Sequence, residues 1–499
     1  MNTAYGLAAV VLVVLAAVLI GAFGLRLSRT TSDFYVASRT VSPLWNASAI
    51  GGEYLSAASF LGIAGLILTY GADMLWLPVG WTGGYLVLLV LVSAPLRRSG
   101  AYTLPDFAEA RLESMAVRRL AGVLVVLIGW LYLMPQFQSA GLVLRAITGA
   151  PEWAGGLLVA AVVAVNVMSG GMRSITFVQA FQYWLKLTAL AVPLVFLLLA
   201  WRDGGAPGLS ARDAASWALP LSSGREYGLY STYSLILATF LGTMGLPHVL
   251  VRFYTNPDGR AARRTTLVVL ALLGAFYMLP AVYGALGRIY LPGLEGSDTV
   301  VLSLPGRLVG GVAGDLLTAL VTAGAFAAFL STSSGLTVSV AGVIGQDILK
   351  GGVRSFRAAA VLAVIVPLVL AVFARSLPVA DVVGLAFAVA ASSFCPLLVL
   401  GIWWRRLTPA GAMAGLLAGG GLACGAVLLT IGGGPYTGLV GAMLAQPAAW
   451  TVPIAFLVMV VVSLLTPGRI PPNVARTMVR LHTPEILNLD RGDWRPRSS

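Results

Sequence analysis

The sequence predicts an all-α polytopic membrane protein with about thirteen transmembrane helices. Of its 499 residues, 58% are hydrophobic and only 10% are charged, whereas about a quarter of the residues in an average soluble domain are charged. Apolar runs of about 20 residues, the length that crosses a bilayer, recur along the whole chain. Basic residues gather in alternate loops between these runs, as expected for a chain that crosses a membrane many times.

The first apolar run has no basic segment before it, so we interpret it as a span and not as a signal peptide. The ninth run is the longest, and it must tilt or extend beyond the bilayer. The thirteen predicted spans lie near 4–25, 45–69, 74–96, 120–143, 153–169, 176–201, 229–250, 265–290, 314–345, 358–374, 382–403, 409–431 and 448–466.

The loop charges predict the orientation of the chain in the cell membrane. If the loop after the first span is cytoplasmic, the cytoplasmic segments hold 24 Lys and Arg residues and the outer segments hold seven, with Lys186 alone inside a span. The positive-inside rule then places the N-terminus outside and the C-terminus in the cytoplasm. The net charge of +13 therefore reflects topology and contact with anionic lipids, and it does not indicate binding of nucleic acid.

Two spans carry helix-breaking residues at equivalent places. The second span contains Gly51 and Gly52, and the seventh contains Gly242, Gly245 and Pro247. These spans are five crossings apart, and an odd number of crossings inverts the second set relative to the first. The pattern predicts two inverted repeats that each open with a broken helix, an arrangement typical of transporter sites. Glycines that only allow helices to pack closely are the alternative.

This reading divides the chain into six parts. They are an extra helix with a cytoplasmic loop (1–44), a first five-helix repeat (45–202), an extracellular loop (203–226), a second inverted repeat (227–404), two additional helices (405–466) and a flexible cytoplasmic tail (467–499).

The ninth span holds "AAFLSTSSG", in which Ala328, Ser331 and Thr332 stand at i, i+3 and i+4 and share one helix face. A carbonyl and two hydroxyls on one face are suitable ligands for a small alkali cation. Hydroxyls that bond back to their own helix are the alternative, which we favour for Ser333 and Ser334.

This motif resembles the sodium:solute symporters, whose ninth span carries A-x-x-S-[ST] and an acidic residue sixteen positions after the serine, here Asp347. The resemblance implies the leucine-transporter-type fold with a 5+5 inverted repeat. It also implies a co-transported sodium ion held between this helix and two carbonyls of the second span. Aligned on this chain, those carbonyls belong to Gly52 and Leu55.

Three stretches, "GGEYLSAASFLG", "GTMGLPHVLVRFYT" and "GGMRSITFVQ", are similar to the acetate and monocarboxylate (cation/acetate symporter) branch of that family. The resemblance implies sodium-coupled uptake of acetate or a related short-chain monocarboxylate, without an organic cofactor. One departure is Gln179, which stands where sugar and proline carriers have an aspartate, so no role of that aspartate is transferred here.

Binding a monocarboxylate requires hydrogen-bond donors and a small apolar pocket. The candidate donors are Ser56, Ser59, Thr243, Gln136 and Gln138, and each of them could equally join two helices. His248 follows the second break and is a minor candidate. Trp81 is expected in the interfacial belt.

Glu53 and Lys186 are ionisable residues inside predicted spans, where a charge is costly and usually functional. Our hypothesis for Glu53 is a co-transported proton. A fixed ion pair with Lys186 and a cap on a half-helix end are the alternatives. The ammonium of Lys186 could also replace the sodium ion, which would make the protein a proton-coupled monocarboxylate symporter.

Other classes of protein fit less well. The chain has no H-E-x-x-H, no G-x-S-x-G and no phosphate-binding loop, so we expect no enzyme. A symporter of another small organic solute stays open. A membrane sensor lacks a signalling domain in this sequence, and a passive channel does not need broken inverted repeats.

Overall fold

The computed structural model describes residues 3–25, 37, 41–219, 226–349, 351–373, 379–433 and 436–485, and these residues form helices and connecting loops without a strand. Six basic loop residues used in the charge count, and the tail after residue 485, lie outside the described residues; they are Arg26, Arg29, Arg39, Arg225, Lys350 and Arg375. The principal helices are α1 (Thr3–Leu25), α3 (Pro43–Tyr54), η2 (Ala58–Gly62), α4 (Ile63–Tyr70), α5 (Trp76–Val87), α6 (Ser93–Arg98), α7 (Leu104–Leu112), α8 (Met115–Thr148), α9 (Glu152–Asp203), α10 (Ala211–Ser216), α11 (Gly228–Gly245), α12 (Pro247–Val251), η5 (Arg252–Thr255), α13 (Gly259–Tyr290), α14 (Val300–Leu308), α15 (Gly311–Val343), η7 (Ile344–Ile348), α16 (Gly352–Phe373), α17 (Val379–Trp403), α18 (Pro409–Gly415), α19 (Gly421–Ile431), α20 (Gly438–Ala445), α21 (Ala448–Leu465) and α22 (Val474–His482).

Within the described residues, eleven helical segments are long and apolar enough to cross a membrane. Two of them, Ala58–Arg98 with 41 residues and α9 with 52 residues, exceed one crossing, because 52 helical residues extend over about 78 Å. Each contains a glycine with positive φ where the helix is interrupted, Gly71 at 78° and Gly171 at 54°. Gly71 and Gly171 divide these two segments, and α3 completes the crossing that ends at Tyr70, so the eleven segments correspond to the thirteen predicted crossings.

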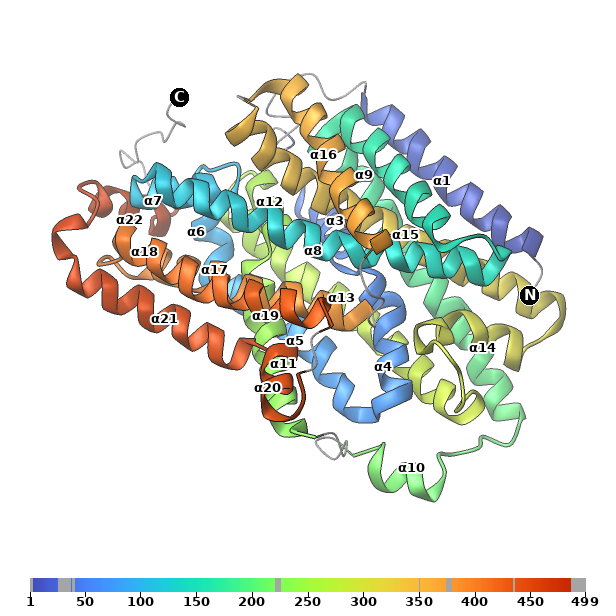
Figure 1. The fold of residues 1–499 in the computed structure, drawn as a ribbon. Coiled ribbons are helices and arrows are strands. Elements are labelled where there is room, and N and C mark those ends of the chain that lie inside the picture. The colour runs from blue at the N-terminus through green and yellow to red at the C-terminus, as the bar shows by residue number, and fades with distance from the viewer. Residues whose placement is uncertain are drawn as a thin grey trace.

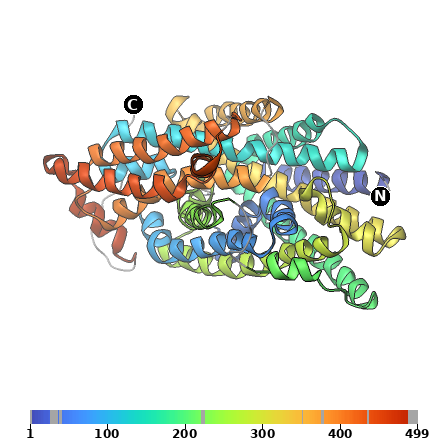
Figure 2. The same cartoon turned by 60° about the horizontal axis from the view of Figure 1, so that its bottom comes forward.

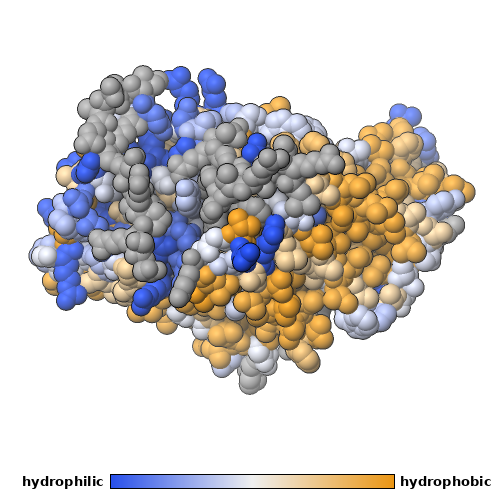
Figure 3. Space-filling view, turned by 90° about the horizontal axis from the view of Figure 1, so that it is seen from above, coloured by the Kyte–Doolittle hydropathy of each residue, from blue (hydrophilic) through white to orange (hydrophobic). Residues whose placement is uncertain are grey.

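Segments from the two halves of the chain meet in the centre of the molecule. The blue α3–α5 region and the green α11–α13 region lie side by side in both ribbon views (Figures 1 and 2), and α3, α4 and α5 all contact α13. The start of α1 and the helix α22 lie at opposite ends (Figure 1), as an odd number of crossings requires. Figure 3 shows a broad apolar surface next to an end where hydrophilic residues gather, the pattern of a membrane-embedded protein.

The expectation of a flexible tail from residue 467 is wrong for its first part. Helix α22 forms there and packs against α6 and α7. Its residues Met478 and Leu481 are buried. Arg98 of α6 also forms an ion pair with Glu485 at 3.3 Å. An amphipathic pattern inside a polar, Pro-rich segment was the signal for this helix.

A cluster of charges joins three elements at the same end of the molecule. Arg118 at the start of α8 forms ion pairs with Asp106 at 2.9 Å, with Asp347 at 2.6 Å and with Glu109. Burial raises the pKa of Asp106 to about 6, although the nearby Arg118 guanidinium opposes that rise. The acidic residue that the family resemblance singles out, Asp347, thus fixes the end of the ninth span to α7 and α8.

Candidate cation and substrate site at two interrupted helices

The first interruption lies at Leu55 and Ser56, three residues after the predicted position. Helix α3 continues through both glycines to Tyr54, and Leu55 has φ −74° and ψ 82°. The backbone N–H of Ser56 donates to Tyr54 at 2.9 Å, so it is not available to the carbonyl of Gly52 four residues earlier. The break therefore leaves the Gly52 carbonyl free for another partner.

The two glycines of the second span serve close packing, which was the alternative interpretation. A Cβ atom on Gly52 would lie 2.1 Å from the backbone oxygen of Gln179, and one on Gly51 would lie 2.8 Å from the ring of Tyr183. Both contacts are with α9. The prediction that Gly51 and Gly52 themselves break the helix is wrong, because both residues keep helical hydrogen bonding.

The second interruption lies at Leu246, between α11 and α12, where φ is −72° and ψ is 117°. Pro247 explains it, because a proline pushes the preceding residue out of the helical region. Gly242 and Gly245 allow α11 to approach α17, since a Cβ on either would lie 2.4 Å from a backbone oxygen of that helix. The predicted interruption of the seventh span is therefore present.

The predicted sodium ligands lie together between α3 and α15. We call them the cation cradle, made of the carbonyl groups of Gly52, Leu55 and Ala328 and the hydroxyl groups of Ser331 and Thr332. The side chain of Lys186 on α9 reaches into it: its Nζ donates to the carbonyls of Gly52 and Leu55, the latter at 2.7 Å, and to Ser331 Oγ at 2.9 Å. Three acceptors match the three N–H groups of an ammonium.

The two hydroxyl groups of the cradle also donate to backbone carbonyls, one on α15 and one on α3. Ser331 Oγ donates to the Ala328 carbonyl at 3.1 Å, and Thr332 Oγ1 donates to the Glu53 carbonyl at 2.6 Å. Every one of these side chains is fully buried. The cradle is thus a closed set of oxygens whose positive partner is the protein's own ammonium.

Glu53 forms a buried ion pair, but its partner is Arg252 and not Lys186, which was the partner in the alternative interpretation. Arg252 Nε donates to Glu53 Oε2 at 2.7 Å, and the side chains are 0% and 1% exposed. The charge count had placed Arg252 in a cytoplasmic loop, and that assignment is wrong. The residue belongs to η5, directly after the broken seventh span, and it turns inward to meet the carboxylate.

Gln179 connects this ion pair to the cradle. Its side-chain oxygen accepts a hydrogen bond from Arg252, and its amide nitrogen donates to the Ser331 carbonyl at 2.7 Å. A neutral amide bridges the two groups where the sugar and proline carriers are expected to have an aspartate. With Glu53, Arg252 and an ammonium at Lys186, the network carries one positive charge in excess.

Four of the five predicted substrate residues gather at the first break. The Ala57 backbone N–H donates to Gln136 Oε1 at 3.1 Å, and Ser59 Oγ lies 3.1 Å from the Tyr277 hydroxyl. Thr243 Oγ1 lies 2.7 Å from the Tyr54 hydroxyl. Ser56 Oγ is buried and lies near Tyr132, but it forms no hydrogen bond of standard geometry among the described residues.

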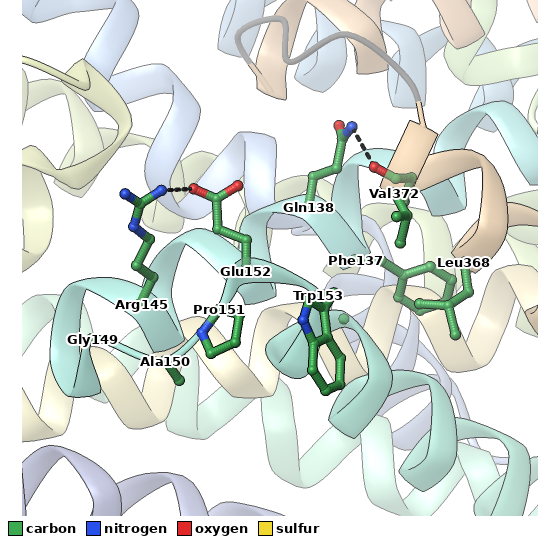
Figure 4. A pocket seen from close by; sticks show the side chains of 12 residues that line it. Phe137, Gln138, Arg145, Gly149, Ala150, Pro151, Glu152, Trp153, Leu368 and Val372 are labelled. Atoms are coloured by element: carbon green, nitrogen blue, oxygen red, sulfur yellow. Dashed lines mark hydrogen bonds and ion pairs between the residues drawn. The ribbon is translucent and has the colours of Figure 1, made fainter.

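Gln138 does not lie with this group. Two residues along a helix correspond to a rotation of about 200°, so Gln136 and Gln138 face opposite sides of α8. Gln138 donates to the Ala371 carbonyl at 3.1 Å and lines a separate pocket of about 630 Å³. Figure 4 shows this pocket beside the ion pair of Arg145 and Glu152.

This separation gives a testable contrast within one helix. We expect Gln136→Leu to lower substrate uptake to below about a tenth of wild type, because a buried N–H at Ala57 loses its acceptor at the break. Gln138→Leu should keep more than about half of wild-type uptake. Both are measured as initial uptake rates normalised to protein in the membrane, and equal losses in the two variants would contradict the assignment.

Sequence reasoning also missed an aromatic cluster around Phe387 of α17. The Phe387 ring lies 5.6 Å from Trp81, 6.1 Å from Tyr54 and 6.0 Å from Tyr132, and Tyr132 lies 5.3 Å from His248. Trp81 is 1% exposed, so its expected place in the interfacial belt is wrong. Only tertiary packing brings these residues from five elements together.

Several polar atoms in and near this cluster are buried without a hydrogen-bond partner in the described part of the chain. They include Trp81 Nε1, the Tyr85 hydroxyl, both ring nitrogens of His248 and both amide atoms of Gln182. Buried polar atoms without partners are uncommon. Tyr85 belongs to the cluster because its ring lies 4.9 Å from that of Tyr54, while Gln182 stands between Gln179 and Lys186 on α9.

Two interrupted helices that meet around buried polar groups define a secondary transporter. A model of the sodium:solute symporter family matches residues 34–419, and this chain belongs to that family. Membership supports sodium-coupled symport of a small solute by a multi-pass membrane protein, and it makes the protein a transporter and not an enzyme.

Two curated relatives are each 33% identical to this chain. The uncharacterized symporter YwcA of Bacillus subtilis aligns over 462 residues, 87% of this chain and 89% of the relative. The monocarboxylic acid transporter of Corynebacterium glutamicum aligns over 439 residues, 79% of this chain and 78% of the relative.

Solved structures confirm the fold. A Na+-coupled sialic acid symporter in a substrate-bound outward-open state has a TM-score of 0.73 at 15% identity, covering 94% of this chain and 98% of that one. Mhp1, a nucleobase-cation-symport-1 family transporter in a closed conformation, has a TM-score of 0.60 at 14% identity, covering 91% and 99%. The leucine-transporter-type architecture predicted from the sequence is therefore present.

Proposed function

We propose that this protein takes up acetate or a related short-chain monocarboxylate by sodium-coupled symport with alternating access. The observation that carries the choice of an anionic cargo is that two basic side chains, Arg252 and Lys186, are buried in one network with a single carboxylate, Glu53. When all three are ionised, this network has one positive charge in excess. A buried excess charge is unfavourable until a partner of opposite sign arrives, and a carboxylate supplies one negative charge.

The apolar character of the surroundings fits a short apolar tail. The rings of Tyr54, which directly precedes the first break, and of Trp81 pack against Phe387, and Ser56 at the break adds a buried hydroxyl. The relative from Corynebacterium glutamicum, named a monocarboxylic acid transporter, supports the same substrate class.

A proton-coupled monocarboxylate symporter is the second candidate function. The specific observation in its favour is the Lys186 amino group, which already donates hydrogen bonds to three members of the cation cradle. A fixed positive charge at that place would reduce the need for a sodium ion.

Uptake into proteoliposomes separates these functions. We expect labelled acetate to accumulate under an inward sodium gradient and not when potassium replaces sodium outside, with unlabelled propionate competing and unlabelled proline not competing. Accumulation that follows an inward proton gradient without sodium would favour the second candidate. Transport of proline in place of acetate would contradict the proposed substrate class.

A further inference from the structure

The cation cradle is filled by a group that belongs to the protein. Lys186 Nζ donates to Leu55 at 2.7 Å, to Ser331 Oγ at 2.9 Å and to the Gly52 carbonyl. Its side chain is 0% exposed. The ammonium satisfies its three donors with oxygens from α3, the break after it, and α15.

These oxygens are the same ones that a sodium ion would require. An ion seated on Gly52, Leu55 and Ser331 would lie at hydrogen-bond distance from the ammonium, and two like charges repel strongly in a buried place. The remaining cradle groups already point into the same region, because Thr332 bonds to the neighbouring Glu53 carbonyl. The cradle therefore has room for one positive charge at a time.

We propose that the Lys186 ammonium and a free sodium ion are alternative occupants of the cation cradle, so that sodium binds there only when it displaces a tethered cation. The lysine then holds the broken second span against the ninth span in the absence of an ion. This inference deepens the proposed function and rests on it for the identity of the competing ion.

The test measures binding of radioactive sodium to purified protein in detergent. Lys186→Met keeps the length of the side chain but removes the charge, and we expect it to lower the Kd for sodium at least about tenfold relative to wild type. Lys186→Gln should also lower the Kd for sodium, and it replaces the methionine variant in the test if that variant does not fold. Lys186→Arg keeps a cation and should bind sodium no more tightly than wild type.

Two further variants assign the gained binding to the cradle. Adding Ser331→Ala to either neutral variant should raise the Kd again at least about tenfold, because one of the ion's oxygens is lost. Tyr183→Phe is the matched control on α9: its hydroxyl donates to the Leu272 carbonyl at 3.1 Å, away from the cradle, and the variant should bind as wild type does. Unchanged sodium affinity in both neutral variants, or tight binding that survives Ser331→Ala, would overturn the proposal.

Transport assays distinguish this inference from the proposed function. If wild-type acetate uptake requires no sodium while the neutral variants gain sodium binding, sodium coupling fails and the competition stands. If wild-type uptake requires sodium and the neutral variants gain nothing, the competition fails and sodium coupling stands.

Discussion

Replacing Glu53 with glutamine is expected to abolish acetate uptake and to lower the free energy of unfolding by about 3–5 kcal/mol, the usual cost of breaking a buried ion pair from one side. The carboxylate and the Arg252 guanidinium are 2.7 Å apart and almost fully buried. Without the negative charge, Arg252 and Lys186 leave two buried cations in one network. Thermal unfolding in detergent measures the first effect, and uptake normalised to protein amount measures the second.

A double-mutant cycle shows whether the pair acts as a unit. Arg252→Gln alone should lower the free energy of unfolding of the protein by a similar amount. The double variant Glu53→Gln/Arg252→Gln should lose clearly less free energy of unfolding than the sum of the two single losses. Simple addition of the two effects would contradict the ion pair as the cause. The matched control is Arg145→Gln, which breaks an exposed pair with Glu152 and should change stability by less than about 1 kcal/mol.

The same variant bears on the hypothesis that Glu53 carries a co-transported proton. The contacts favour the alternative of a fixed ion pair, with Arg252 in the place expected for Lys186. If Glu53 carries a proton, an inside-negative membrane potential should accelerate uptake by the wild-type protein. The Glu53→Gln variant should then lose only this acceleration and keep sodium-driven exchange. Complete loss of uptake together with loss of stability is the outcome that the ion pair predicts.

Gly52→Val should reduce uptake to below about a tenth of wild type. Already the first added atom would lie 2.1 Å from the Gln179 backbone oxygen, so α3 or α9 must shift, and overpacking of this kind costs about 1–3 kcal/mol. The shift would also move the Gly52 carbonyl away from Lys186, which donates to it. Uptake and the amount of protein in the membrane are both measured, because a loss of insertion alone would have a different cause.

Gly274→Val is the matched control for this prediction. Gly274 also lies in a transmembrane helix, α13, but no atom lies within 4 Å of the place where its Cβ would be. We therefore expect this variant to keep most of its uptake. A Gly52→Val protein that transports as well as the Gly274→Val protein would show that the close approach of α3 and α9 is dispensable.

The sequence alone predicted the membrane class, the thirteen crossings and the interruption before Pro247. These features depend on local properties, namely the length of apolar runs and the effect of proline on the residue before it. The helix face formed by Ala328, Ser331 and Thr332 was also accessible, because helical periodicity fixes which residues share a face.

Other features could not be predicted, because they depend on which residues meet across distant parts of the chain. Gly51 and Gly52 look like helix breakers in the sequence, but close packing against α9 decides that they stay helical and that the break lies at Leu55. Arg252 looks like a loop charge, and only the neighbouring carboxylate of Glu53 explains its burial. Gln136 and Gln138 are the same type of residue on the same helix, but their side chains face opposite sides of it.

Lys186 shows most clearly what the tertiary structure decided. From the sequence, the residue is an isolated charge within a span, and both an ion pair with Glu53 and a substitute for sodium were open. The fold places its Nζ against three oxygens of α3 and α15, and it gives Glu53 a different partner in Arg252. A buried charge must find its partners in three dimensions, so the sequence by itself determines that such a charge needs partners, and the packing of the helices determines which ones it has.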